Sequence, residues 1–311
     1  MTAPAVLEAR HLSRWFGEVI AVNDVSLSLG PGVTGLLGLN GAGKTTLFRL
    51  MAGLLAPSRG EILLHGRRLR REVGLFRQVG FCPESDALFD WLTGREFLVL
   101  ALRLLGLPES EVRERAAAAL ARLRLADAAD RRVGGYSKGM RQKLKLAQAL
   151  AHDPRVVFLD EPLNGTDPVS RAEIVELVRE LGASGCTVIV SSHVLPEVEA
   201  MTDRVVLIHH GRLVASGDVA GIREAIHDRP VTVALTTPVP RRWAALLAAR
   251  PEVVGVELDA DGRVVARTDH AAAFYRALPA WRRDSGLPLA AVETLDDSLQ
   301  AVFDYLVEEN A

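Results

Sequence analysis

The sequence predicts an α/β fold, in which a sheet of buried strands is connected by helices. Two continuous apolar runs, residues 155–160 and 187–190, are typical of strands in a parallel sheet covered on both faces. A third apolar run, residues 33–37, is followed by a glycine-rich loop and by a helical pattern over residues 46–55. Strand, loop and helix in this order form a known unit of α/β proteins, in which the loop binds phosphate.

Residues 38–46 have the sequence Gly-Leu-Asn-Gly-Ala-Gly-Lys-Thr-Thr, which matches the phosphate-binding loop pattern. Glycines let backbone N–H groups point at phosphate oxygens, and the following helix adds the positive end of its dipole. We expect Lys44 to reach the β- and γ-phosphates of a nucleotide and Thr45 to hold Mg²⁺. An ordinary glycine-rich turn is the alternative, which the flanking strand and helix disfavour. The predicted nucleotide-binding residues of this loop are Asn40, Gly41, Ala42, Gly43, Lys44, Thr45 and Thr46.

Length and composition limit the number of domains and the classes of function that the chain can have. A chain of 311 residues has room for two domains, and its net charge of −2 gives no electrostatic case for binding nucleic acid. The cysteines, Cys82 and Cys186, are too few for a disulfide framework or a zinc site, which fits a reducing cytosol. No apolar run approaches the ~20 residues that cross a bilayer, and the N-terminus has no signal-peptide pattern. We therefore expect any membrane role to need a partner.

Lysine is rare in this chain, although cations are not. Only four of the 37 basic residues are lysines, and the rest are arginines. Where arginine is the default cation, a lysine is informative. One lies in the phosphate loop, and the other three follow residue 137: Lys138, Lys143 and Lys145.

The N-terminal segments 6–12 and 19–29 are predicted strands, with Trp15 and Phe16 between them. This aromatic pair has two interpretations that the residues leave open: packing at a strand end, or stacking on an adenine ring. Short strands are predicted at residues 60–64 and 79–82, followed by the polar loop 83–86.

Residues 93–151 are predicted to form a helical insertion between strands of the sheet. Thr93 and Glu96 make a capping box that opens a helix to Leu105. An alanine-rich amphipathic pattern predicts a second helix over residues 108–123. Ser137 is the predicted N-cap of a third helix, which runs to about residue 151.

Two acids and a histidine are predicted at the edge of the sheet where ligands bind. Asp160 and Glu161 end the strand 155–160, and His193 follows the strand 187–190. In a phosphate-loop protein the first acid would hold Mg²⁺ and the second could polarise the attacking water. A solvated acidic turn and a structural histidine are the alternatives. Lys44 favours the catalytic interpretation, and the position of His193 favours contact with a γ-phosphate.

The segment Gly-Gly-Tyr-Ser-Lys-Gly-Met-Arg-Gln, residues 134–142, resembles the signature motif of ABC transporter ATPases. The phosphate loop, the signature, the two acids, the loop 164–167 and His193 have the order and spacing of that family over about residues 5–218. Within the family, the chain is similar to the ATPase subunits of drug, polysaccharide or lipid exporters. The segment Phe-Cys-Pro-Glu, residues 81–84, and the Tyr-Ser-Lys-Gly-Met form of the signature indicate this branch.

The resemblance implies an ATPase that uses ATP and Mg²⁺ on the cytoplasmic face of the membrane, bound to a separate transmembrane permease. Two copies, or one copy and a related ATPase, would enclose two ATP molecules. Ser137 and Gly139 resemble the residues that close the other subunit's nucleotide, and Asp167 would lie at the dimer seam. Phe16, or Trp15, resembles the adenine-stacking aromatic residue.

The other family roles fall on residues already singled out: Glu161 as general base, His193 as γ-phosphate sensor, and Lys44, Thr45 and Asp160 as phosphate and Mg²⁺ ligands. The chain also departs from the family pattern. Glu84 replaces the usual glutamine, at a position that contacts the metal or the attacking water. Lys138, Met140 and Thr166 replace a glycine, a polar residue and a leucine. None of these changes removes the base or the phosphate lysine, so we expect hydrolysis.

The predicted architecture is thus an α/β phosphate-loop NTPase core with an antiparallel β subdomain and a helical insertion, over residues 1–225. Residues 230–311 form a predicted accessory domain with the order β-α-β-β-α-β-α, which suggests a small α+β ferredoxin-like fold. Asp261 and Gly262 mark its hairpin turn. Its last helix, residues 296–308, has an apolar stripe that suits a core or a dimer contact.

Three other functions compete with an exporter subunit. An importer ATPase subunit is the nearest, and the short C-terminal extension argues only weakly against it. Ribosome-associated ATPases of this superfamily resemble two cassettes in one chain, whereas this chain has one phosphate loop. In chromosome- and repair-type ATPases a long coiled coil separates the loop from the signature, and here fewer than a hundred residues do so.

Overall fold

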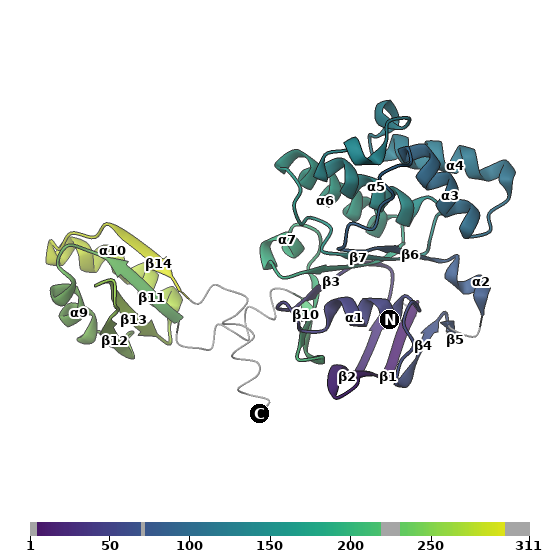
Figure 1. Cartoon of the computed structure of the whole chain (residues 1–311). Coiled ribbons are helices and arrows are strands. Elements are labelled where there is room, and N and C mark those ends of the chain that lie inside the picture. The colour runs from purple at the N-terminus through teal and green to yellow at the C-terminus, as the bar shows by residue number, and fades with distance from the viewer. Residues whose placement is uncertain (1–4, 70–71, 219–230, 296–311) are drawn as a thin grey trace. The chain divides into compact units, whose positions relative to one another are not determined.

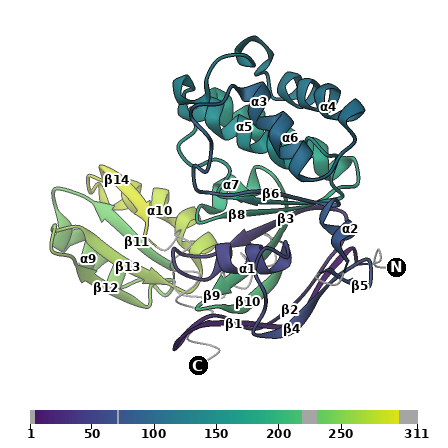
Figure 2. The same ribbon diagram turned by 45° about the vertical axis from the view of Figure 1, so that its right-hand side comes forward.

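A computed structural model of the chain describes residues 5–69, 72–218 and 231–295. The chain divides into two units, Met1–Gly217 and Asp218–Ala311. Figures 1 and 2 show them from two directions. The residues predicted to bind a nucleotide all belong to the first unit.

The first unit is built on a six-stranded sheet with the order β10-β9-β3-β8-β7-β6. The pairs β9–β3, β3–β8, β8–β7 and β7–β6 are parallel, as the apolar runs predict. Its strands are β3 (Gly32–Leu37), β6 (Val79–Cys82), β7 (Val156–Asp160), β8 (Thr187–Ser192), β9 (Arg204–His209) and β10 (Arg212–Asp218).

Both faces of this sheet are buried, and β7 shows how the side chains divide between them. Val157 and Leu159 pack into the core beneath the helical insertion, whereas Val156 and Phe158 pack into the core on the opposite face. This alternation is the period of two expected for a strand. Because successive side chains of β7 enter both cores, residues 156–159 are all apolar.

A second, antiparallel sheet lies across helix α1 (Lys44–Met51) from the first, with the order β2-β1-β4-β5. Figures 1 and 2 show α1 between the two sheets, and the rings of Phe48 and Phe158 meet with centroids 5.4 Å apart. The chain thus has the α/β phosphate-loop fold with an antiparallel β subdomain. The strands of the second sheet are β1 (Leu7–Phe16), β2 (Val19–Leu29), β4 (Arg59–Leu64) and β5 (Arg67–Arg68).

Two predicted boundaries in this region are wrong. Trp15 and Phe16 do not lie between strands but belong to β1, because Trp15 pairs with Ile20 and Phe16 with Val19 across the hairpin. The helix predicted at residues 46–55 begins at Lys44 and ends at Met51. Gly53 follows with φ +75°, a left-handed backbone that cannot continue a right-handed helix.

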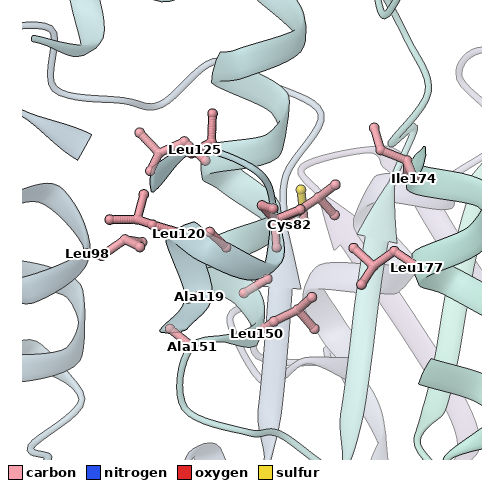
Figure 3. Packing of buried hydrophobic residues seen from close by; sticks show 14 of the residues in the cluster. Cys82, Leu98, Ala119, Leu120, Leu125, Leu150, Ala151, Ile174 and Leu177 are labelled. Atoms are coloured by element: carbon pink, nitrogen blue, oxygen red, sulfur yellow. The ribbon is translucent and has the colours of Figure 1, made fainter. Parts of the chain in front are cut away.

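The helical insertion is present with its predicted caps. It contains α3 (Gly94–Leu104), α4 (Glu109–Arg122), α5 (Lys138–Leu150) and the short helices η2 (Ala126–Ala128) and η3 (Val133–Gly135). Thr93 and Glu96 make both bonds of the capping box, and Ser137 Oγ accepts the N–H of Met140 at the start of α5. Figure 3 shows side chains from these helices, such as Leu98 and Leu120, in one core with Leu177 of α6 (Pro168–Ala183).

Besides η2 and η3, two short α-helices were not anticipated, α2 (Val73–Phe76) and α7 (Leu195–Glu199). Both are too brief to leave a helical period in the sequence. Each fills a connection between longer elements of the first unit.

The second unit has the predicted order β-α-β-β-α-β over its described residues. Its four-stranded antiparallel sheet has the order β12-β13-β11-β14, and its core includes Trp243, Phe274 and Trp281. The helix predicted at residues 296–308 lies outside the described residues. The elements are β11 (Val231–Thr236), α9 (Pro240–Ala248), β12 (Gly255–Leu258), β13 (Val264–Thr268), α10 (Ala271–Ser285) and β14 (Ala291–Thr294).

Gly80 in β6 sets how closely α5 can approach the sheet. A Cβ at this position would lie 2.2 Å from the carbonyl oxygen of Ala149. We predict that Gly80→Ala lowers the free energy of unfolding by about 1–3 kcal/mol, because the backbone of α5 must move. Gly74→Ala is the matched control, since nothing lies within 4 Å of its added methyl group, and it should change stability by less than about 1 kcal/mol. Urea unfolding measures both, and equal effects would contradict the prediction.

Candidate nucleotide-binding site

The strand order brings the predicted residues together. β8 lies between β3 and β7, with Leu37 beside Ser192 and Asp160 beside Ser191. Because these strands are parallel, their carboxyl ends share one edge of the sheet. The phosphate loop follows β3, Asp160 and Glu161 end β7, and His193 follows β8. There Glu161 is in direct contact with both Lys44 and His193.

The loop before α1 is shaped by contacts with two other strands. Gly43 has φ +103°, and a Cβ on it would lie 2.4 Å from the carbonyl oxygen of Ala21 in β2. The N–H of Gly211, in the turn between β9 and β10, donates to the carbonyl of Ala42 at 2.9 Å. No side chain in the described part of the chain caps the first N–H groups of α1. The sequence did not predict that Ala21 and Gly211 contact the phosphate loop, because neither residue belongs to a recognisable motif.

Lys44 is buried at 7% exposure, and its ammonium group has three contacts. Nζ donates to the carbonyls of Gly38 at 2.5 Å and Leu39 at 3.4 Å. It also lies 3.2 Å from Glu161 Oε1, and that carboxylate is equally buried. Because water does not screen a buried ammonium group, its attraction to an anionic phosphate is stronger than at the surface.

Glu161 combines an unusual backbone with two partners for its side chain. Its φ of +46° is left-handed, a conformation that costs a non-glycine residue about 1–3 kcal/mol. Its backbone N–H donates to Ser191 Oγ at 2.9 Å, which helps to hold that conformation. Its Oε2 lies 3.0 Å from Nδ1 of His193, whose side chain is 44% exposed. The arrangement fixes a buried carboxylate between a lysine and a histidine that reaches solvent.

Asp160 is 1% exposed and has one free oxygen. Its Oδ1 accepts a hydrogen bond of 2.7 Å from Ser191 Oγ. Its Oδ2 is buried without a hydrogen-bond partner among the described residues. Such an oxygen fits a hard cation such as Mg²⁺, for which the half-buried Thr45 at the start of α1 is the second predicted ligand. The described residues contain no group of three or more His, Cys, Asp or Glu side chains that could hold a metal ion.

Ser191 was not predicted to have a role, yet it bonds to both acids. Its hydroxyl donates to the carboxylate of Asp160 and accepts from the N–H of Glu161. The only signal in the sequence is a hydroxyl residue at the polar end of an apolar strand. That signal does not say which neighbour the hydroxyl contacts.

The signature residues lie where α5 meets α6. Gly139 is buried, and a Cβ on it would lie 2.8 Å from Ser170 Oγ and 3.0 Å from Asp167 Oδ2. Asp167 caps α6 by accepting the N–H groups of Ser170 and Val169, and the hydrogen bond from Ser170 is the main reason that its pKa is lowered. Ser137 is exposed, and its Oγ already caps α5.

Two predicted site residues, Phe16 and Glu84, make no contact with the Lys44, Glu161 and His193 side chains among the described residues. Phe16 is 47% exposed at the end of β1, and the guanidinium of Arg14 lies 4.6 Å from the centre of its ring. Its neighbour Trp15 is 37% exposed. Glu84 is exposed in the loop after β6, and within the part of the chain that the structure describes its carboxylate has no hydrogen bond or ion pair. At the tip of the phosphate loop, Asn40 and Gly41 are also exposed.

A family model described as ABC transporter matches residues 22–164. An uncharacterized ABC transporter ATP-binding protein of Nostoc is 42% identical over 245 residues, which cover 76% of this chain and 72% of that protein. DrrA of Mycobacterium tuberculosis, a doxorubicin resistance ATP-binding protein, is 39% identical over 68% of this chain and 65% of its own length. A solved structure of an ATP-binding subunit of an ABC transporter is similar with a TM-score of 0.65 and 33% identity, covering 71% of this chain and 93% of that one.

The chain therefore belongs to the ABC transporter family of ATP-binding proteins. It also resembles much longer relatives. The human phospholipid-transporting ATPase ABCA7 is 40% identical over 81% of this chain, but the chain spans only 12% of that protein. The mouse and rat ABCA7 proteins are matched over 11% and 9% of their lengths. Among the described residues, no helix is both long and apolar enough to cross a membrane.

We predict that Ser191→Ala lowers the free energy of unfolding by about 1–3 kcal/mol, because it leaves a buried carboxylate oxygen and a buried N–H unpaired. Thr187→Val on the same strand is the matched control. The hydroxyl of Thr187 is buried without a hydrogen-bond partner among the described residues, so its loss should be neutral or stabilising. Denaturant unfolding of both variants checks the pair, and a smaller loss for Ser191→Ala than for Thr187→Val would refute it.

Proposed function

We propose that this chain binds and hydrolyses ATP to power a membrane exporter, as a subunit attached to a separate permease on the cytoplasmic face of the membrane. The observation that carries the proposal is the buried pair of Lys44 and Glu161, which His193 contacts from the solvent side, together with the unpaired oxygen of the preceding residue, Asp160. These groups supply a phosphate-binding cation, a base, a residue that orients the base, and a metal ligand at one sheet edge.

In this proposal Lys44 binds the β- and γ-phosphates, which replace the carboxylate of Glu161 as its partner. Glu161 then accepts a proton from the water that attacks the γ-phosphorus, and ADP leaves with the bridging oxygen. His193 keeps the Glu161 carboxylate in place and reaches the γ-phosphate from its exposed side. Asp160 and Thr45 would hold Mg²⁺, which neutralises phosphate charge when bound. Phe16 would stack on the adenine ring.

Two copies of the chain would enclose two ATP molecules in this proposal, with Ser137 and Gly139 of each copy facing the other's nucleotide. The exposed oxygen of Ser137 at the start of α5 supports such a contact, because a helix N-terminus attracts phosphate. Asp167, exposed at the start of α6, would lie near the seam between the copies.

The exporter branch is supported by its named relatives. DrrA is named for doxorubicin resistance, and ABCA7 for phospholipid transport. A permease partner is supported by large apolar side chains that are exposed on and beside the helical insertion, notably Trp91 at 68% and Leu104 at 80%. We further propose that residues 1–225 are the ATP-binding domain and 230–311 an accessory domain, whose β12-β13-β11-β14 sheet has the strand order of a ferredoxin-like fold.

Replacing the base tests the proposed function most directly. We expect Glu161→Gln to keep ATP binding and to lower turnover by ~10² or more, because the amide cannot accept the proton. Lys44→Ala is the contrasting variant and should lose tight ATP binding itself. A fluorescent ATP analogue measures binding, and phosphate release measures turnover. Hydrolysis at the wild-type rate in Glu161→Gln would rule out the assigned base.

A further inference from the structure

Lys145 is a buried cation that the proposed function does not use. It lies in the third turn of α5 and is 5% exposed. Its Nζ donates to three backbone carbonyls in succession, those of Pro83 at 2.9 Å, Glu84 at 2.9 Å and Ser85 at 3.4 Å. An ammonium group has three N–H donors, so every donor is used.

These carbonyls are the direct partners of the Lys145 charge. Among the described residues, Lys145 has no ion pair with a carboxylate. Cys82, which precedes the loop, is fully buried, and burial raises the pKa of its thiol to about 12, so it is neutral at neutral pH. Burying a charge without partners is costly, so the ammonium is stable there only while the three carbonyls converge on it. The lysine and the backbone of the loop therefore hold each other in place.

A second cation on α5 binds the same segment of chain, residues 83–90, which we call the Glu84 loop. Arg141 Nε lies 2.6 Å from Asp86, and its Nη1 lies 2.7 Å from Asp90. Arg141 and Lys145 are four residues apart, so they lie on the same face of the helix. The Glu84 loop is thus attached at two points to one face of α5.

Ser137, at the start of α5, is four residues before Arg141 and so continues the same face. A helix of this length moves as a rigid element. A displacement at Ser137 therefore reaches the Glu84 loop through the two cations.

We propose that Lys145 is a positioning residue, which fixes the Glu84 loop to α5 and thereby links the Glu84 carboxylate to Ser137 of the same subunit. This rests on the proposed function, in which Ser137 faces the partner's nucleotide, and on the expectation from the sequence that Glu84, at the family position that contacts the metal or the attacking water, serves the nucleotide of its own subunit. Closure on one nucleotide would then place Glu84 at the other. Three carbonyls that converge on one point suit a compact ammonium and not a planar guanidinium, which accounts for a lysine here in an arginine-rich chain.

The test compares four variants of the full chain: Lys145→Met, Lys145→Arg, Arg141→Gln and, as a matched control, Lys143→Met. Lys143 lies on the same helix but pairs with Glu173 of α6, which keeps Arg124 as a second partner at 2.7 Å. Hydrogen–deuterium exchange of peptides within residues 83–90 measures how firmly the loop is held. Steady-state ATPase assays over a range of Mg²⁺ concentrations give kcat, the KM for ATP and the Mg²⁺ requirement.

We expect Lys145→Met to accelerate exchange in the Glu84 loop and to lower kcat by ~10-fold or more, while the KM for ATP changes by less than about threefold. Half-maximal turnover should also need more Mg²⁺. Lys145→Arg should be intermediate, Arg141→Gln should show a smaller change in the same direction, and Lys143→Met should match the wild type.

Faster exchange with unchanged kcat and Mg²⁺ requirement would make Lys145 a packing residue and overturn the proposal, as would unchanged exchange. If Lys145→Met does not fold by circular dichroism, Lys145→Arg and Arg141→Gln decide the same question. A wild-type chain without ATPase activity would refute the proposed function instead. The exchange data would then still show whether Lys145 holds the loop.

Discussion

The parallel pairing of β8 between β3 and β7 is the constraint on which the site depends. It sets two acids, a histidine and the phosphate loop at one edge, although they come from distant parts of the chain. The pairing is stable only because both faces of the sheet are covered, by α1 and the second sheet on one side and by the helical insertion on the other. Apolar burial thereby fixes the positions of charged groups that could not gather by themselves.

Those charged groups then depend on one another. Lys44 and Glu161 are buried together, so removing Lys44 would leave Glu161 with His193 alone, and removing Glu161 would leave the Lys44 charge with backbone carbonyls alone. Ser191 joins the two acids through a single hydroxyl, although Asp160 ends the strand and Glu161 has already left it in a left-handed turn. Hydrogen bonds therefore hold both acids in place, while Asp160 Oδ2 stays buried without a partner among the described residues and one side of His193 is exposed.

Much of this could be predicted from the sequence, for a physical reason. Lys44, Asp160, Glu161 and His193 each follow a buried strand, and local patterns reveal strands that are apolar throughout. The caps at Thr93 and Ser137 are equally local. The contacts that could not be predicted join separate segments through groups without a signature: the carbonyl of Ala21, the hydroxyl of Ser191, and the three carbonyls bound by Lys145. The scarcity of lysine singled out Lys145, but its partners are backbone atoms that any sequence supplies.

The packing of Gly139 bears on how inactive variants of the signature are interpreted. Because a Cβ there would lie 2.8 Å from Ser170 Oγ and 3.0 Å from Asp167 Oδ2 of the same chain, any larger residue must first displace these two side chains at the start of α6, before a nucleotide is considered. Loss of activity at this glycine would arise from the fold of one subunit as readily as from a failed contact with another. Ser137 is exposed and has no such packing restriction, but its Oγ caps α5, so a genetic screen there reports the contact between subunits only through replacements that keep the cap.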